Sequence, residues 1–328
     1  MLGHVKDSSA KRPALLARLK GRGRRGEVVF IALSALAALT LVALVLLMVY
    51  ELTVTALPSL QRFGAGFIGA TTWDPVNEQF GALTAIYGTL VTSFLAMVIA
   101  VPLSVGAAVF LAELAPHGVR DAASFLIELL AAVPSVIYGL WGLFVLVPLV
   151  KHPLEAFLGD YLGFLPLFQG PRFGVGMLAG GIILAIMVLP IVTATARDII
   201  RMVPDSQKEA MLALGATRWE TIWKVVLPYA RSGITGAIIL GLGRALGETM
   251  AVTMVIGNAP IISASLFSPA HTMASQVASE FAEATGRLYI SSLIEIGLLL
   301  LGITLVVNVL ARLLVWKSTG GSRTGEAV

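Results

Sequence analysis

Residues 234–256 read ITGAIILGLGRALGETMAVTMVI, an apolar run that is long enough to cross a bilayer core and that carries Arg244 and Glu248 near its middle. A charge at the centre of a membrane helix costs about 2.5–3.5 kcal/mol on insertion scales, so such residues usually face a protein interior or a water-filled path. At a spacing of four, both side chains are expected on one helix face, where they partly neutralise each other. Gly243 and Gly247 form a small-xxx-small stripe that favours close approach of another helix. The run predicts a transport pathway.

The composition of the whole chain indicates an integral membrane protein. Hydrophobic residues make up 57% and charged residues 13% of the 328 residues, and the mean hydropathy is +0.89, which leaves too little polar surface for a soluble globule. The fold class is therefore all-α, with six transmembrane helices that we expect at Val28–Tyr50, Leu83–Leu111, Phe125–Val150, Val175–Ile199, Ile234–Ile256 and Tyr289–Trp316. The first is expected to remain as an anchor, because it is too long for a cleaved signal and lacks a cleavage site.

Lys and Arg residues are distributed unevenly among the connections. Most of the 23 lie in the tail before Val28, in the connections that follow the second and fourth predicted spans, and in the C-terminal tail. The connections that follow the first, third and fifth spans hold only Arg62, Lys151, Arg172 and Arg287. The positive-inside rule therefore predicts that both termini are cytoplasmic. We expect a basic tail at 1–27, an anchor helix at 28–52, an extracytoplasmic connection at 53–79, a permease core at 80–316 and a cytoplasmic tail at 317–328. The basic tail is interpreted as a topology signal that contacts membrane lipid, and no nucleic-acid partner is expected.

The longest cytoplasmic connection, 197–231, has a pattern of two short helices. Ser206 to Glu209 and Thr217 to Glu220 each have the spacing of a capping box. Gly215 lies between them, where a helix of about eight residues would stop in a left-handed conformation. We expect the second helix to end at Leu227-Pro228. Such a compact amphipathic element suits docking into a groove on a partner protein.

The same connection resembles the EAA loop of ATP-binding-cassette importer permeases, through Glu209-Ala210-Met211, Gly215 and Val225-Val226-Leu227-Pro228. The family resemblance implies the type I ABC importer permease fold and a loop that seats in a cytoplasmic ATPase. It implies that the residues that contact the ATPase are Glu209, Ala210, Gly215, Ala216, Trp219, Leu227 and Pro228. Met211 stands where the family usually has alanine, and Val225 where it usually has isoleucine. Both replacements are apolar. A surface hairpin without a partner is the alternative interpretation.

Three further segments narrow the family. Together with Gly215-Ala216-Thr217-Arg218-Trp219-Glu220, the segments 129–142, 241–252 and 257–260 are similar to PstC-type permeases of phosphate-specific importers. The resemblance runs from about Leu83 to Trp316 and implies a bacterial inner-membrane location. It also implies that Arg244 and Glu248 take part in phosphate passage. A structural ion pair that locks helix packing is the alternative for these two residues.

Other polar residues lie in or next to the predicted spans. Pro134 lacks an amide donor and is expected to kink its helix, which leaves Ser135 and Tyr138 near freed carbonyls, where they could also reach substrate. Glu128, Glu295 and Asn308 are expected to make contacts between helices. The four histidines are scattered and the chain has no cysteine, so we predict no metal site.

The chain lacks a phosphate-binding loop of the Walker type, so we expect it to be no enzyme and to bind no cofactor, with ATP and Mg on a separate ATPase. The implied partners are a PstA-like second permease, a PstB-like ATPase dimer and a PstS-like phosphate-binding protein, for which the polar stretch His271 to Ala284 is a candidate docking surface. The predicted function is ATP-driven phosphate import by alternating access. The alternatives are a permease for sulfate or molybdate, a membrane scaffold in phosphate signalling, and an ion-coupled transporter.

Overall fold

The structure is a computed structural model that describes residues 12–319, with side chains placed from Gly26 to Leu313. Of the predicted tails 1–27 and 317–328, residues 1–11 and 320–328 lie outside the described residues, and side chains are described only at 26 and 27. The chain divides into two compact units, 1–54 and 55–328. Most of α1 (Arg12–Phe63) belongs to the first unit. Its long apolar side chains from Val28 to Val45 are exposed, as expected for a helix that faces lipid. The predicted first span lies within the membrane-compatible segment Gly26–Phe63.

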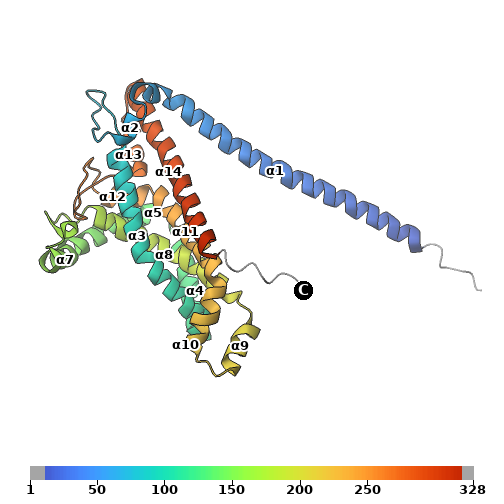
Figure 1. The fold of residues 1–328 in the computed structure, drawn as a ribbon. Coiled ribbons are helices and arrows are strands. Elements are labelled where there is room, and N and C mark those ends of the chain that lie inside the picture. The colour runs from blue at the N-terminus through green and yellow to red at the C-terminus, as the bar shows by residue number, and fades with distance from the viewer. Residues whose placement is uncertain (1–11, 320–328) are drawn as a thin grey trace, which may run out of the picture. The chain divides into compact units, whose positions relative to one another are not determined.

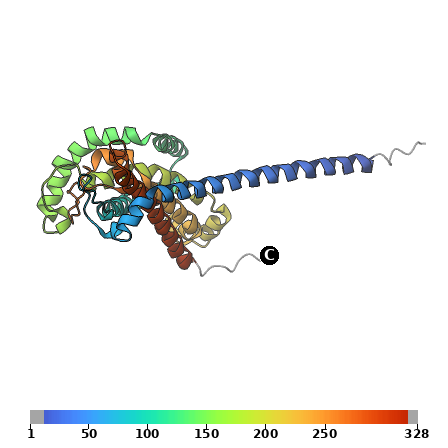
Figure 2. The same cartoon turned by 90° about the horizontal axis from the view of Figure 1, so that it is seen from above.

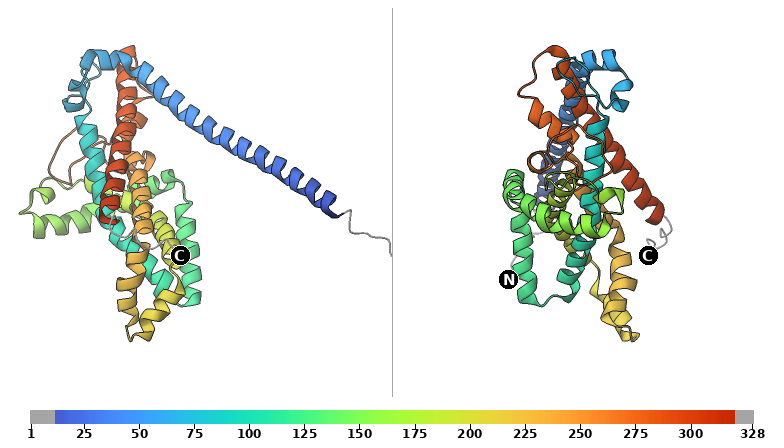
Figure 3. Two further views of the ribbon diagram at one scale, coloured as in Figure 1. Left: turned by 45° about the vertical axis from the view of Figure 1, so that its right-hand side comes forward. Right: turned by 90° about the vertical axis from the view of Figure 1, so that its left-hand side faces the viewer.

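The second unit consists of helices joined by short connections. Its described residues contain isolated β-bridges but no sheet. In chain order the helices are α2 (Gly66–Gly69), α3 (Leu83–Val109), α4 (His117–Ala131), α5 (Ser135–Trp141), α6 (Val147–Leu149), α7 (Glu155–Leu162), α8 (Met177–Arg201), α9 (Asp205–Ala213), α10 (Arg218–Thr221), α11 (Leu227–Gly247), α12 (Met250–Val255), α13 (Met273–Glu280) and α14 (Arg287–Thr319). Figure 1 shows α2 and α13 at one end of this unit and α9 and α10 at the other, and both views of Figure 3 agree.

α8 forms the centre of this second unit. It packs against α3, α4 and α11, and most of its side chains are buried. Small residues allow the helices to approach closely, because a Cβ atom at Gly241 of α11 would lie 2.6 Å from Cγ2 of Val192, and one at Gly233 would lie 2.5 Å from Cγ2 of Ile199. The close approach of α11 to α8 is therefore made at Gly233 and Gly241, and not at Gly243 and Gly247, where the stripe was expected. A Cβ atom at Gly243 would have ordinary contact with Asn308 of α14, and Gly247 borders open space.

Six membrane-compatible helices are present in the described part of the chain, as predicted. Four of them include or lie close to the predicted spans, and two differ strongly in their bounds. The predicted third span, Phe125–Val150, is wrong because α4 ends at Ala131 and the helix restarts at Ser135. Pro134 lacks an amide donor and disfavours the helical conformation in the preceding residue, so the break falls there. The membrane-compatible helix is instead Ser135–Leu162, which continues through π-helical turns. From above, the segment from α4 to α7 follows an arc along the outside of the unit (Figure 2).

The predicted fifth span, Ile234–Ile256, is also wrong in its bounds. A continuous helix runs from Arg218 to Gly247, and α12 is a separate short helix. The π-helical turn Ile222–Val226 precedes Pro228, and the wider turn carries the helix past the proline. The expected end at Leu227-Pro228 is therefore wrong as well, and the second helix of the loop forms the beginning of a membrane span.

The end of the second unit that carries α13 is held by polar contacts between α3 and the segment before α13. Thr84 Oγ1 and Nε2 of His271 share a hydrogen bond at 2.9 Å, and the amide of Met273 donates to Thr89 Oγ1 at 2.9 Å. Gly88 lies between these threonines, and a Cβ atom there would overlap the carbonyl oxygen of His271. The helix and the segment thus meet backbone to backbone at Gly88.

Burial of the His271 imidazole lowers its pKa from 6.5 to about 4. Below pH 6.5 the unfolded chain therefore binds more protons at this site than the folded chain. The stabilisation that the neutral imidazole contributes is fully present above pH 6.5 and falls, by roughly 3 kcal/mol in all, as the pH drops towards about 4. We expect the thermal melting temperature in detergent to fall over this range, and to fall less in the variant His271→Gln. His117→Gln, at an exposed histidine of α4, should leave the pH profile unchanged. Parallel profiles for the native chain and His271→Gln would contradict this prediction.

Candidate functional site

Arg244 and Glu248 lie at an interruption between two helices. Arg244 is in the last turn of α11, whereas Glu248 follows the helix with an extended backbone, ψ 129°. The expectation that both side chains share one face of a continuous helix is therefore wrong. The two side chains still meet, with 3.8 Å between Nη2 of Arg244 and Oε2 of Glu248. The side chain of Arg244 is 42% exposed, and that of Glu248 is 6% exposed.

Glu248 is held in place by the start of α12, while Arg244 keeps its donors available. Oε1 of Glu248 accepts a hydrogen bond of 3.4 Å from the amide of Ala251, in the first turn of α12. A nitrogen–oxygen distance of 3.8 Å is an ion pair but exceeds a hydrogen bond. Within the described residues, the Arg244 guanidinium makes no hydrogen bond. The arrangement offers the donors of a half-exposed arginine to an anion. Because a buried carboxylate lies beside the arginine and repels an anion, it suits an anion that binds briefly better than one that stays bound.

α5, the helix that follows the break at Pro134, packs on α12, the helix that follows the break at Gly247. A Cβ atom at Gly139 of α5 would lie 2.6 Å from Sδ of Met254 and 3.0 Å from Cα of Ala251, so the glycine lets α5 lie directly on α12. The hydroxyl of Tyr138 donates across the break to the carbonyl of Leu130 at 2.8 Å, as the loss of a helix bond at Pro134 predicts. Ser135 begins α5 and is half-buried, and no contact joins it to Arg244.

Interrupted helices are tolerated in membranes where they are buried in protein or line a cavity, and they commonly form substrate sites in transporters. Arg244 and Glu248 lie at the break between α11 and α12, and Tyr138 lies in α5, which packs on α12. The sequence predicted these residues, but it placed the acidic and basic pair in the middle of one helix. No cluster of three or more metal-ligating side chains occurs among the residues that the structure describes.

The other polar residues of the spans make contacts between helices. Glu128 of α4 accepts a hydrogen bond of 3.0 Å from Arg197 of α8, as expected for helix contacts, and Arg197 also pairs with Asp198. The Arg197 side chain is buried inside α8, although the sequence assigned it to a cytoplasmic loop. Glu295 is buried in α14, and Asn308 lies beside Gly243.

The predicted coupling element consists of α9, a tight corner and the beginning of the helix 218–247. Gly215 has a φ of +85°. Its amide donates to the carbonyl of Leu212 at 2.9 Å, and the amide of Ala216 donates to the carbonyl of Met211 at 3.3 Å. This pair of bonds is the Schellman motif that ends a helix at a glycine. Thr217 and Glu220 then form both bonds of a capping box, so the predictions for Gly215 and for the second capping box are confirmed.

The first predicted capping box, at Ser206 and Glu209, is wrong. α9 begins at Asp205, with Pro204 as its N-cap and without a side-chain cap. Pro204 has the extended conformation that an N-cap needs, and this places Ser206 inside the first turn instead of before it. α9 has no buried side chain, and Leu214, Trp219 and Trp223 are exposed. Glu209 and Ala210 are also exposed, whereas Ala216 and Leu227 are half-buried.

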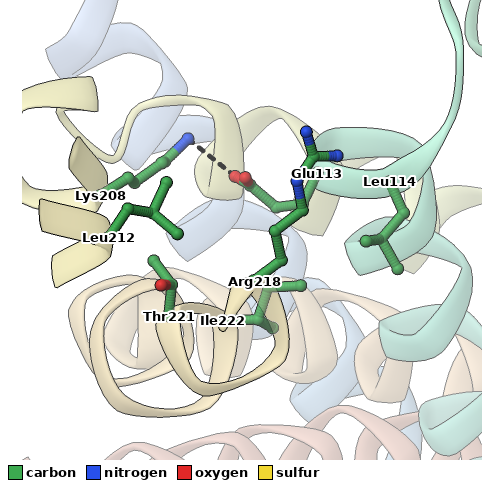
Figure 4. A pocket seen from close by; sticks show the side chains of 7 residues that line it. All are labelled: Glu113, Leu114, Lys208, Leu212, Arg218, Thr221 and Ile222. Carbon is green, nitrogen blue, oxygen red and sulfur yellow. Dashed lines mark ion pairs between the residues drawn. The ribbon is translucent and has the colours of Figure 1, made fainter. Parts of the chain in front are cut away.

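Sequence reasoning missed the contact that ties α9 to the rest of the unit. Nζ of Lys208 lies 2.8 Å from Oε1 of Glu113, which belongs to the π-helical turn Phe110–Leu114 after α3. Figure 4 shows the pair beside a cavity of about 230 Å³. The sequence carries a weak signal for it, namely an acidic residue at the end of an apolar span, but no spacing rule connects positions 113 and 208.

The stretch His271 to Ala284, expected as a docking surface for a binding protein, is only partly available. α13 occupies Met273–Glu280 within it. Ser275 and Gln276 are buried, whereas Ser279 is exposed and Glu280 half-buried. Glu280 accepts hydrogen bonds from Trp73 at 2.6 Å and from Tyr289 at 2.7 Å. Glu280 therefore ties the end of α13 to Trp73 and Tyr289 of the same unit.

Removing the confirmed capping box is expected to loosen the corner. The hydroxyl of Thr217 accepts from the amide of Glu220 at 3.3 Å, and loss of an N-cap costs about 1 kcal/mol. In Thr217→Ala, amide exchange at residues 218–221 should therefore be about five times faster. Thr235→Ala, which removes a hydroxyl bonded within α11, should leave these amides unchanged. Equal exchange in the native chain and in Thr217→Ala would show that the capping box does not stabilise the corner.

Comparison with known proteins agrees with this architecture. A solved bacterial alginate ABC transporter, in complex with an alginate pentasaccharide-bound periplasmic protein, has a chain with a TM-score of 0.60 at 16% identity, covering 94% of this chain and 99% of its own. The fold is therefore that of an ABC importer permease. The family model for the binding-protein-dependent transport system inner membrane component matches residues 104–317.

Curated relatives narrow the family further. The phosphate transport system permease protein PstC of Pasteurella multocida is 51% identical over 263 residues, covering 79% of this chain and 82% of the relative. The PstC of Mesorhizobium japonicum is 44% identical over 303 residues, covering 91% and 92%. PstC 2 of Mycobacterium tuberculosis is 40% identical over 318 residues, covering 94% and 98%. The chain belongs to the binding-protein-dependent permease family, and within it to the PstC type, as its sequence resemblance predicted.

Proposed function

We propose that this chain is a transmembrane subunit of an ATP-driven importer that moves inorganic phosphate into the cytoplasm by alternating access. The observation that carries the proposal is the position of Arg244, a half-exposed arginine at the point where two interrupted helices meet. The names of the curated relatives support phosphate as the substrate in preference to sulfate or molybdate.

The chemistry of the site supports an anion that binds and leaves. Arginine stays protonated and offers a planar fork of donors that matches phosphate oxygens. Glu248 lies 3.8 Å from it, close enough to reduce the cost of the unoccupied cation and to compete with an anion for it. An arriving phosphate would take the Arg244 donors, and the nearby carboxylate would repel the bound anion and favour its release. We infer that the Tyr138 hydroxyl, which donates to the Leu130 carbonyl, exchanges this partner for the same anion.

The end of the unit that carries α9 supports docking of a separate ATPase. Leu214 is 85% exposed and Trp219 is 60% exposed, which is costly in water and is typical of a protein contact. The Schellman motif and the capping box at residues 211–220 give this surface a fixed shape. We assign this end to the cytoplasm, in agreement with the distribution of basic residues, and the α13 end to the extracytoplasmic side. Glu209, Ala210, Gly215, Ala216, Trp219, Leu227 and Pro228 are the proposed coupling residues.

A second permease chain completes the proposed pathway. An apolar groove of about 310 Å³ opens beside Tyr138, lined by Leu130, Val133, Ile137, Trp141 and Ile186. A homologous subunit that covers this groove would close the pathway around the two helix breaks. A phosphate-binding protein would deliver substrate at the α13 end, where Ser279 remains exposed.

The test is uptake of labelled phosphate into proteoliposomes that contain this chain, the second permease, the ATPase and the binding protein. We expect uptake that requires ATP and all four proteins, and that excess sulfate or molybdate does not reduce. Competition by sulfate or molybdate would indicate a broader oxyanion permease. Uptake driven by an ion gradient without ATP would overturn the proposed mechanism, and signalling without uptake would indicate a scaffold.

A further inference from the structure

The ion pair between Glu113 and Lys208 joins two segments that are far apart in the sequence. Lys208 lies in α9, and Glu113 lies in the π-helical turn that ends the span Leu83–Leu114. The two charged atoms are 2.8 Å apart, and the side chains are only 17% and 14% exposed. A partly buried pair at this distance is held more strongly than a surface pair, because less water screens it.

The neighbouring ion pairs of the same region are local and exposed. Lys224 pairs with Glu220 one turn away at 3.4 Å, with 62% and 44% exposure. Lys208 also lies 3.4 Å from Asp205 in its own helix, and Asp205 is 86% exposed. Among the ion pairs in the described residues, the Glu113–Lys208 pair is the one that ties α9 to a membrane span.

Side-chain packing does little to hold α9 at this place. The helix has no buried side chain, and the cavity beside the pair is lined by Leu114, Leu212, Arg218, Thr221 and Ile222 (Figure 4). A force on α9 therefore reaches the membrane helices by the backbone, through residues 202–204 into α8 and through the corner at Gly215 into the helix 218–247. The Glu113–Lys208 pair adds a side-chain route that leads into α3. α3 in turn packs against α8 and α11.

We propose that Glu113 and Lys208 are positioning residues that transmit movement of α9 to α3, so that ATP hydrolysis on the docked ATPase is coupled to phosphate passage. The proposal rests on the proposed docking of an ATPase at α9. The pair stays closed through the transport cycle, and α9 and the end of α3 move together. Loss of the Lys208 charge leaves Glu113 partly buried without its cation, and loss of the Glu113 charge leaves Lys208 with only Asp205 of its own helix. Either change removes the ion pair between α9 and the span.

The test compares Glu113→Gln, Lys208→Gln and the exchanged variant Glu113→Lys with Lys208→Glu, each in the full four-protein complex in proteoliposomes. Phosphate uptake and ATP hydrolysis are measured together, with co-purification of the ATPase as a check on assembly. We expect uptake to fall about tenfold in each single variant while hydrolysis changes less than about twofold, and the exchanged variant to recover most of the uptake. Lys224→Gln, which removes the exposed pair, should change neither quantity.

A second measurement uses the absence of cysteine from the native chain. Cysteines at positions 113 and 208 are joined by a short bifunctional thiol reagent, which replaces the ion pair with a covalent link. We expect the linked complex to transport phosphate and the unlinked double-cysteine complex to transport poorly.

Three results would overturn the inference. Uptake and hydrolysis that fall in proportion would make the pair a structural contact only. Failure of the single variants to assemble, together with no gain of transport when the double-cysteine complex is linked, would lead to the same conclusion. Transport that stops on linking would show that the pair must open. If the native complex itself shows no ATP-driven uptake, the proposed function fails, and this outcome is visible before any variant is examined.

Discussion

Replacement of Arg244 by glutamine is expected to reduce phosphate uptake at least about a hundredfold, because a bidentate charged contact to an oxyanion is worth several kcal/mol. Glutamine keeps much of the side-chain length and its hydrogen-bonding capacity but loses the positive charge and the fork of donors. The half-exposed position of Arg244, beside rather than inside the buried core, predicts that the complex still assembles.

The measurement is uptake into proteoliposomes, with the amount of assembled complex determined in the same preparation. Arg231→Gln is the matched control, since it makes the same change at an exposed arginine of the same helix, α11, and it should leave uptake unchanged. Arg244→Lys should give an intermediate rate, because lysine restores the charge without the planar fork. Full uptake by Arg244→Gln would assign the Arg244–Glu248 pair to helix packing alone.

Gly88→Ala is expected to be the most destabilising of the single-methyl changes considered. Its Cβ atom would overlap the carbonyl oxygen of His271, which is backbone and cannot rotate away. Either α3 or the segment before α13 must shift, which also strains the nearby hydrogen bonds of Thr84 and Thr89. We expect a loss of about 3 kcal/mol and a fall in the melting temperature of at least about 5 °C.

Gly106→Ala, in the same helix, is the control for this prediction. A Cβ atom at Gly106 meets nothing within 4 Å, so alanine should be neutral or should stabilise α3 slightly through its higher helix propensity. Thermal melting of both variants in detergent separates the two positions. If Gly88→Ala melts like the native protein, α3 and the His271 segment are not in fixed backbone contact.

Several features could be predicted from the sequence because local rules determine them. Apolar length gave the six spans, and the left-handed corner at Gly215 and the capping box at Thr217 follow from short-range chemistry. The break at Pro134 was placed correctly, although we expected a kink in one helix instead of two helices.

The remaining features depend on tertiary contacts that no spacing rule contains. No proline marks the end of α11 at Gly247. The break becomes visible only in the fold, where Glu248 is extended and accepts from the amide of Ala251 in α12, which packs on Gly139. α9 begins one residue earlier than its sequence pattern indicates, so Pro204 is its N-cap and Ser206 lies inside the first turn. The Glu113–Lys208 pair joins positions whose proximity only the packed fold creates.

The fixed corner at Gly215 joins the proposed coupling element to a long helix, so that a small rotation at the corner becomes a large displacement at the other end of that helix. The helix that follows it runs without interruption from Arg218 to Gly247, 30 residues, or about 45 Å at 1.5 Å per residue. If this helix tilts as a rigid rod about the end next to Gly215, each degree of tilt moves its far end by about 0.8 Å. Arg244 sits almost at that far end, so a rotation of only a few degrees at the ATPase displaces the guanidinium by more than the length of a hydrogen bond.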